Sequence, residues 1–180
     1  MAAISIDSSD LRRLIRQIDR IQAKLPQAIA RGLNEGGDRV RTHTQRALQK
    51  QNGLTRYASV TKRVRTARAF PGGMNYSIIV SGKPATRPAE FRTRVTTGPG
   101  GGVTIWLWNR AHKFKRSFQQ KLKGGLRMRL DAARLPVRGF DGPNLAKEAV
   151  KDQTAEAFYR TTAAVAVATV EKQMMRVLGR

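Results

Sequence analysis

The stretch EFRTRVTTGPGGGVTIWLWN, residues 90–109, carries the clearest structural pattern in the chain. Apolar and polar residues alternate on both sides of a glycine-rich centre, with Phe91 and Val95 before it and Val103 and Ile105 after it. Alternation with a period of two is typical of strands that bury one face. The stretch therefore predicts two strands joined at the glycines. The two tryptophans on the second strand are more typical of a core or an interface than of a base-stacking platform.

Further strands are predicted on both sides of this hairpin. The sequence YSIIVSG is rich in branched residues and is stopped by Gly82 and Pro84. The sequence LRMRLD alternates strictly and should place Arg127 and Arg129 on an outer face. The sequence LPVRGF is a short strand with a proline near its start, which indicates the edge of a sheet. Residues 75–140 are thus expected to form a central antiparallel sheet of about four to five strands.

The first 70 residues have a helical pattern. Leucines and isoleucines from Leu11 to Leu25 recur at helical spacing, and Pro26 should end or kink this helix because proline cannot donate a backbone hydrogen bond. A second helix is expected to run to about Lys50, and a third, basic helix to begin at Leu54. Three glycines weaken the second helix, which indicates either a bend or the close approach of another helix or subunit. These glycines are Gly32, Gly36 and Gly37.

The C-terminal part is predicted to be one long helix. The turn Asp141-Gly142-Pro143-Asn144 leads into apolar residues at helical spacing that continue to about Leu178. An alanine-rich stretch, residues 163–168, would allow close packing on a neighbour. Helices, then antiparallel strands, then a helix indicate an α+β fold. We expect residues 1–180 to form a single domain with a helical part (1–70), strands (75–140) and a C-terminal helix (143–178).

Charge is the strongest compositional signal. The chain has 35 Lys and Arg against 12 Asp and Glu, a net charge of +23. Residues 52–130 hold 17 of the basic residues and a single acid, Glu90. Such a field attracts polyanions and repels other copies of the chain. Arginine outnumbers lysine 24 to 11, which favours bidentate contacts to phosphate or carboxylate. A nucleic acid or a strongly acidic protein surface is therefore the expected partner.

Other classes of protein find little support in the composition. The chain has no cysteine, which excludes disulfides, thiolate zinc sites and thiol nucleophiles and fits an intracellular origin. The N-terminal residues form no secretory apolar region, and no run approaches the ~18 apolar residues of a membrane span. We therefore expect no membrane partner.

No enzyme is visible in the sequence. His43 and His112 have no second ligand at metal-binding spacing. Glu148, Asp152 and Glu156 recur every four residues and would share one helix face, which is typical of a metal site or a catalytic pair but more often of a solvated or salt-bridging face. A third interpretation is that this stripe meets the basic face of the next subunit in a ring. We expect no catalytic, metal or cofactor site.

The sequence contains no known phosphate-binding or nucleic-acid-binding motif. The glycine run GPGGG leads into a strand, whereas a phosphate loop leads into a helix N-terminus. No helix-turn-helix, RNP or KH motif is recognisable. By alternation and clustering alone, nine basic residues are predicted to face DNA or a protein partner. They are Arg92, Arg94, Lys113, Lys115, Arg116, Lys121, Lys123, Arg127 and Arg129.

The basic stretch KRSFQQKLKGGLRMRL, the following ARLPVRGFDGPNL and the terminal VEKQMMRVLGR together resemble the minor tail protein Z family of tailed bacteriophages and prophages. Members commonly show an Arg-x-Pro-hydrophobic strand, a Gly-Pro-Ser-like turn and a basic terminal helix. This sequence has Asn144 where serine is common and lacks a second proline soon after it. The residues that match the motif are Arg134, Leu135, Pro136, Val137, Gly142 and Pro143.

The resemblance implies a tail-completion or neck protein at the head-proximal end of the tail. It implies an oligomeric ring, most naturally a hexamer, with the tail terminator and head-connector proteins as neighbours and genome DNA in the lumen. The chain would then belong to the virion and occupy the cytoplasm of the bacterial host during assembly. The alternative from charge alone is a sequence-nonspecific nucleic-acid-binding protein of ribosomal or nucleoid type. A nuclease would need a clustered acid and histidine site.

Overall fold

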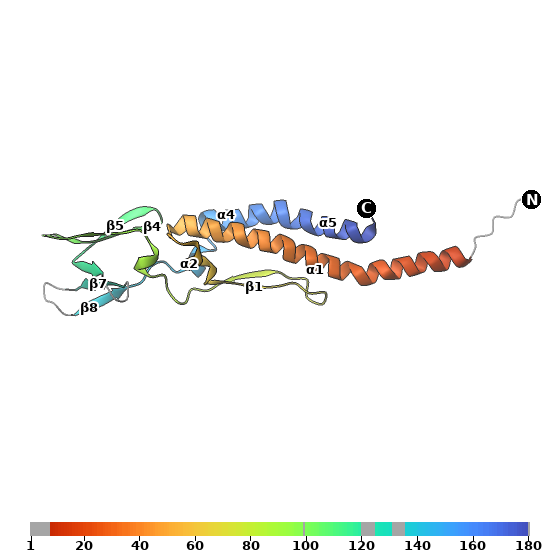
Figure 1. The fold of residues 1–180 in the computed structure, drawn as a ribbon, viewed down its shortest axis with the longest axis horizontal. Coiled ribbons are helices and arrows are strands. Elements are labelled where there is room, and N and C mark those ends of the chain that lie inside the picture. The colour runs from red at the N-terminus through yellow and green to blue at the C-terminus, as the bar shows by residue number, and fades with distance from the viewer. Residues whose placement is uncertain (1–7, 99, 120–124, 131–135, 180) are drawn as a thin grey trace, which may run out of the picture. The chain divides into compact units, whose positions relative to one another are not determined.

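A computed structural model describes residues 8–98, 100–119, 125–130 and 136–179. The fold is α+β, as predicted: a long N-terminal helix, three small antiparallel sheets and C-terminal helices (Figure 1). The chain divides into two compact units, each described separately below. Unit 1 comprises Met1–Val40, Ala67–Ser77 and Thr161–Arg180, and unit 2 comprises Arg41–Thr66 and Ile78–Arg160. The expectation of a single domain stays a prediction.

The elements follow one another in a simple order. The helices are α1 (Ser8–Asn52), α2 (Tyr57–Thr61), the 3-10 turn η1 (Pro88–Glu90), α3 (Leu145–Glu148), α4 (Asp152–Thr161), the π-helical turn η2 (Thr162–Ala166) and α5 (Val167–Leu178). The strands are β1 (Val64–Ala67), β2 (Ser77–Val80), β3 (Thr93–Thr96), β4 (Gly102–Leu107), β5 (Arg110–Lys115), β6 (Ser117–Gln119), β7 (Leu126–Arg129) and β8 (Val137–Phe140).

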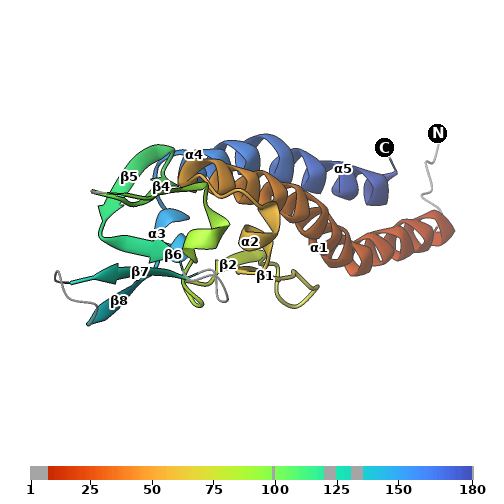
Figure 2. The same cartoon turned by 60° about the vertical axis from the view of Figure 1, so that its left-hand side comes forward.

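The N-terminal helices differ from the prediction. Helix α1 continues through Pro26, so of the two predicted outcomes, an end or a kink of the helix, the end is wrong. Proline removes one amide donor, and the ring clash is relieved where the helix bends, which Figures 1 and 2 show in its N-terminal half. The predicted third helix is limited to α2, because from Val64 onward the chain pairs with β2 as strand β1.

In unit 1, α1 and α5 run side by side at the glycines (Figures 1 and 2). A methyl group added at Gly32 would lie 2.6 Å from Val170 Cα, and one added at Gly36 would lie 2.8 Å from Ala166 Cα. Real Cβ atoms do not approach other atoms that closely, so both positions require glycine. The predicted close approach of another helix is therefore confirmed, with the alanine-rich stretch supplying part of the contact surface.

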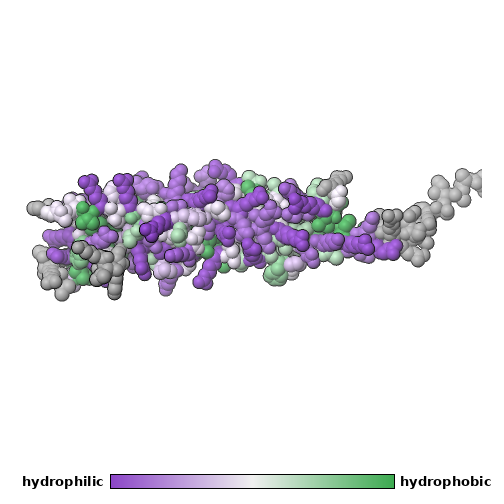
Figure 3. All heavy atoms as spheres, in the orientation of Figure 1, coloured by the Kyte–Doolittle hydropathy of each residue, from purple (hydrophilic) through white to green (hydrophobic). Residues whose placement is uncertain are grey.

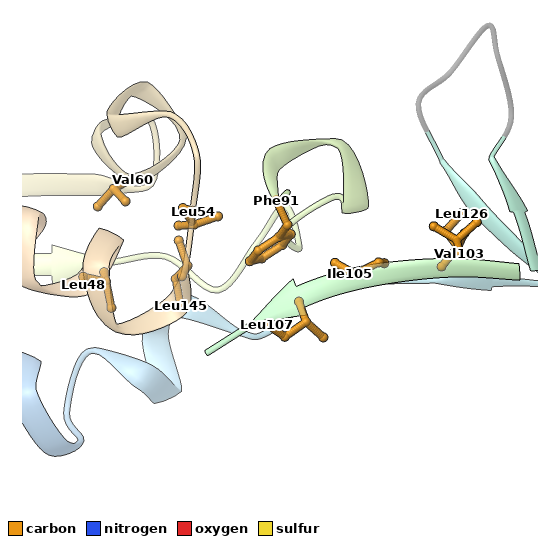
Figure 4. Packing of buried hydrophobic residues seen from close by; sticks show 9 residues of the cluster. All are labelled: Leu48, Leu54, Val60, Phe91, Val103, Ile105, Leu107, Leu126 and Leu145. Atoms are coloured by element: carbon orange, nitrogen blue, oxygen red, sulfur yellow. The ribbon is translucent and has the colours of Figure 1, made fainter. Parts of the chain in front are cut away.

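In unit 2, the core is built on strand β4. Val103, Ile105 and Leu107 are buried, while Thr104 and Trp106 between them are only partly covered, which confirms the predicted alternation. Figure 4 shows these side chains in one cluster with residues from α1, the 3-10 region, β7 and α3. The cluster consists of Leu48, Leu54, Val60, Phe91, Val103, Ile105, Leu107, Leu126 and Leu145.

The strands form three small sheets instead of one central sheet. Their orders are β1-β2, β3-β4-β5 and β6-β7-β8. The predicted hairpin is confirmed: β3 and β4 pair antiparallel, and Gly98 and Gly100 have the positive φ angles (109° and 72°) that favour glycine at the turn. Strand β8 lies at the edge of its sheet, as its nearby proline predicted. A tight reversal at Arg116 (φ 56°) separates β5 from β6 and divides the strands between two sheets.

The C-terminal helix begins where predicted but is interrupted. The Asn144 side chain accepts a hydrogen bond from the Ala146 amide (3.0 Å) and caps α3. The helix then stops after Glu148 and restarts at Asp152, which has a positive φ of 46°. The reason is a distant side chain: Gln51 Oε1 accepts from both the backbone amide (2.9 Å) and the hydroxyl (2.6 Å) of Thr154 and so replaces the carbonyls of a continuous helix.

Candidate polyanion-binding surface

The outer face of sheet β3-β4-β5 is basic. Arg94 on β3 pairs with Thr104 on β4, and Thr104 pairs with Lys113 on β5, so the three side chains form one row across the sheet. Arg92 and Lys115 extend this face in the next rows, because residues two apart on a strand point to the same side. Arg92, Arg94, Lys113 and Lys115 are all exposed. We name this set the basic face of β3-β5.

An aromatic side chain lies within this face. The Arg92 guanidinium sits 4.7 Å from the centre of the Trp106 ring, and the Trp106 amide donates to the Arg92 carbonyl (3.0 Å). Such a cation–π contact orients the guanidinium without neutralising its charge. Trp108 lies beyond the end of β4 and has a positive φ of 50°. It is 42% exposed, and its Nε1 donates a hydrogen bond to Glu148 Oε2 (3.0 Å). Neither tryptophan belongs to the buried core, so the core interpretation of the pair is wrong.

The neighbouring sheet β6-β7-β8 repeats this arrangement. Phe118 on β6 pairs with Arg127 on β7, and the Arg129 guanidinium lies 5.7 Å from the centre of the Phe118 ring. Phe118 is 39% exposed, and Arg127 and Arg129 are exposed as predicted. Arg116, in the reversal before β6, is also exposed. Seven of the nine predicted basic residues are therefore solvent-accessible, while Lys121 and Lys123 lie outside the described residues.

Acidic side chains are missing from these sheets. Strands β3 to β8 contain no Asp or Glu. Glu90, three positions before β3, accepts a hydrogen bond from Arg63 Nη2 (3.1 Å), and Arg63 is only 5% exposed. The remaining guanidinium donors of Arg63 bond the carbonyls of Ser59, Pro84 and Ala85. The single acid of residues 52–130 is thus used inside the fold and does not neutralise the outer charge of the sheets.

The acidic stripe does not form a chemical site. The break before Asp152 takes Glu148 off the helix that carries Asp152 and Glu156, so the three carboxylates do not share one helix face as predicted. Glu148 instead pairs with Lys151 (3.9 Å) and accepts from Gln51 Nε2 (3.4 Å), which agrees with the salt-bridging interpretation. Across the described residues, no group of three or more His, Cys, Asp or Glu could hold a metal ion.

The two histidines lie in different environments. His43 is exposed on α1. His112 on β5 is partly buried and contacts Trp108 edge to face, with ring centres 6.1 Å apart. Neither lies in a group of metal-ligating side chains within the described part of the chain.

The residues of the family motif have structural contacts where they are described. The Gly142 amide donates to the Thr86 carbonyl (2.8 Å), and the Thr86 hydroxyl donates to the Pro143 carbonyl (2.8 Å). These bonds hold the turn against the core before α3 begins. Val137 is half-buried in β8 and Pro136 is exposed, whereas Arg134 and Leu135 lie outside the described residues.

Sequence reasoning missed two groups that the fold brings together. Arg63 gave no signal of burial, because its partners are backbone carbonyls that only the fold places around it. Gln51 likewise resembled any polar residue at a helix end, although it bonds α3 and α4 at once. The only available signal was its position just before the Asn52-Gly53 break.

Hydrophilic side chains cover most of the face seen in Figure 3, in keeping with the charge. None of the described helices combines the length and apolarity needed to cross a membrane. Comparison with protein-family models, curated proteins and solved structures finds no match to this chain.

Proposed function

We propose that the chain is a structural phage protein of the head-proximal tail end, a tail-completion or neck protein that forms an oligomeric ring, joins the tail to the head connector and lets DNA pass. The resemblance of its sequence to the minor tail protein Z family suggests this role. The tail terminator and head connector would be its neighbours, and the virion its final location.

One structural observation supports the proposal independently of the resemblance. The outer faces of two sheets are basic, and their strands contain no acid. Arg and Lys on a strand surface contact phosphates through charge, and phosphate contacts bind every DNA sequence equally. A conduit through which a whole genome passes needs that property. The same faces suit an acidic neighbouring protein, whose carboxylates would pair with the arginines.

The test of the tail-completion role is fractionation of nuclease-treated phage lysate into heads, tails and whole particles, with quantitative mass spectrometry for this chain. We expect the protein to remain with tails at a fixed copy number near that of one ring. Release of the protein by nuclease, or its cofractionation with ribosomes and never with tails, would exclude this role.

The second candidate is a sequence-nonspecific nucleic-acid binder of ribosomal or nucleoid type. The contact between Arg92 and Trp106 favours it, because an arginine on an aromatic face is also a common platform for nucleic acid. In this case purified protein should bind duplex DNA with an affinity that falls steeply with salt. Stable incorporation into tails that resists both nuclease and salt would argue against this candidate.

A matched pair of variants tests whether the basic face of β3-β5 is the contact surface. The first removes four charges from that face: Arg92→Ala, Arg94→Ala, Lys113→Ala and Lys115→Ala. The control removes four exposed charges from unit 1: Lys24→Ala, Arg31→Ala, Lys172→Ala and Arg176→Ala. If each face residue neutralises one phosphate, the slope of log K against log salt should fall by about 3.6 in the first variant. Equal slopes in the two variants would mean that only net charge matters.

A further inference from the structure

Unit 2 contains a cavity beside the glycine turn of the β3-β4 hairpin. Its volume is about 500 Å³, which lies within the range of small-molecule sites. Strands β3, β4, β6 and β7 supply its walls, and all of these strands belong to unit 2. None of the described residues that line the cavity is acidic, and none belongs to the basic face of β3-β5. The cavity is therefore a separate feature with its own positive charge.

Two arginines of this cavity lie opposite each other. The Arg129 amide donates to the Arg116 carbonyl (3.1 Å). This bond continues the antiparallel pairing of β6 with β7, so the two residues are cross-strand neighbours. Like charges in such a position destabilise a sheet. Neither guanidinium forms an ion pair with a carboxylate of the described residues. An anion bound in the cavity would relieve the repulsion by accepting from both groups.

The backbone of Arg116 has a conformation that favours glycine. Its φ angle is 56°, in the left-handed region. The side chain is exposed, so packing of its stem gives no reason for an arginine at this position. The next residue fixes the reversal, because the Ser117 hydroxyl accepts from the Val103 amide (2.9 Å) and donates to the Phe114 carbonyl. A strained residue held at a cavity wall is typical of a functional site.

The remaining walls suit a planar aromatic group. Phe118 is 39% exposed, and the Arg129 guanidinium lies 5.7 Å from the centre of its ring. An aromatic ring and an arginine together are a common platform for unstacked bases of nucleic acids. Val95, which is 50% exposed, adds apolar surface, and Thr96 and Thr97 carry hydroxyl groups that can bond a base or a sugar. A carboxylate side chain of an acidic peptide would use the arginines but has no need of the exposed ring.

We propose that this cavity binds one unpaired nucleotide, either free or within a single strand. Its phosphate accepts from Arg116 and Arg129, and its base lies against Phe118. Bases in a duplex are stacked on one another and are not available to this ring. The cavity therefore differs from the basic face of β3-β5, which requires only phosphates. The inference goes beyond the proposed tail role, since it requires neither a ring nor a neighbouring protein.

Isothermal titration calorimetry with the purified whole chain tests the class of ligand. We expect deoxythymidine monophosphate to bind about 5–150-fold more tightly than inorganic phosphate, which is the effect of stacking one base on an aromatic ring. Phe118→Ala should remove this difference and leave the weaker phosphate binding in place. Arg116→Gln with Arg129→Gln should weaken nucleotide binding by about tenfold or more. The matched control is Arg110→Gln with Arg138→Gln, which removes two exposed charges of unit 2 outside the cavity.

A further variant separates binding from folding. Glycine adopts the left-handed backbone without steric cost, so Arg116→Gly should keep or raise the Tm while nucleotide binding falls. Loss of binding in a chain that is at least as stable cannot be attributed to unfolding. Unchanged nucleotide affinity in this variant would contradict the role of Arg116.

Three other results would overturn the proposal. They are equal affinities for the nucleotide and inorganic phosphate, an equal loss in the control with Arg110 and Arg138 changed, and competition by a tetraglutamate peptide as strong as by the nucleotide. Asp131, two positions after Arg129, lies outside the described residues. A gain of about tenfold in Asp131→Asn would mean that this carboxylate already fills the site, which would also overturn the proposal.

A short oligothymidylate distinguishes the two sources of the nucleotide. Tighter binding than that of the monophosphate, with the same loss on changing both cavity arginines, indicates a nucleotide within a strand. Equal affinities indicate a free nucleotide. All these measurements use pure protein, so their failure leaves the tail-fractionation result independent.

Discussion

Replacement of Arg63 should destabilise unit 2 more than replacement of any exposed arginine. The side chain is 5% exposed and donates four hydrogen bonds, three to backbone carbonyls at 2.6–3.0 Å and one to Glu90 at 3.1 Å. Arg63→Met keeps much of the apolar stem but leaves all four acceptors without their donor. Its matched control is Arg65→Met, an exposed residue on strand β1 that lies two positions after Arg63.

The magnitude follows from the burial of the pair. Removal of one partner of a buried ion pair costs about 3–5 kcal/mol, because the other partner and its neighbours stay desolvated. Glu90 keeps 22% of its side chain exposed and can recover part of its hydration, so we expect about 3 kcal/mol. For a chain of this length that corresponds to a fall of roughly 6–12 °C in Tm. Arg65→Met should change the free energy of unfolding by less than about 0.5 kcal/mol.

Tryptophan fluorescence in a urea titration measures this free energy, because both tryptophans, Trp106 and Trp108, lie in unit 2 and report its unfolding. Glu90→Gln serves as a second variant, which keeps a hydrogen-bond acceptor and should cost less than Arg63→Met. A loss below about 1 kcal/mol for Arg63→Met, or equal losses for the Arg63 and Arg65 variants, would refute the assignment of a buried structural arginine.

Two further predictions concern local packing. Gly36→Val places a branched side chain against Ala166, where α1 packs on η2, and should cost about 1–3 kcal/mol by overpacking. Thermal unfolding followed by circular dichroism measures the loss, and an unchanged Tm would contradict the close approach. Asn144→Ala removes the cap of α3 and should cost about 1 kcal/mol in the same assay, with Asn144→Asp as the variant that keeps the cap; equal losses for the two would show that capping is not the cause.

Local patterns of the sequence were sufficient for the strands around the glycine turn and for the start of the last helix. The hairpin at residues 90–109 depends on neighbours a few positions apart. The Asn144 side chain likewise caps the helix by bonding the amide of Ala146, only two positions further along. The fate of Pro26 was harder to predict, because one lost hydrogen bond weakens a helix without deciding whether it ends.

Long-range partners explain what the sequence could not show. The break before Asp152 depends on Gln51, which lies 103 positions from Thr154 in the chain, and no periodicity encodes such a pair. The hydrogen bond from Arg63 to Glu90 depends in turn on the path that residues 84–90 take around the guanidinium group. For the candidate surface, alternation predicted the exposed basic residues, but it did not reveal that Arg92 and Arg129 each lie over an aromatic ring.

The contacts of Gly32 and Gly36 on α1 with α5 and η2 also limit how far related sequences can diverge. Surface arginines tolerate exchange as long as the charge persists, whereas Gly32 and Gly36 have backbone atoms of Val170 and Ala166 within 3 Å of any added carbon. Homologues that keep this fold should therefore retain the two small residues four positions apart, while the individual basic residues of the surface change. Distant members of the lineage would be recognised by that spacing long after overall identity has been lost.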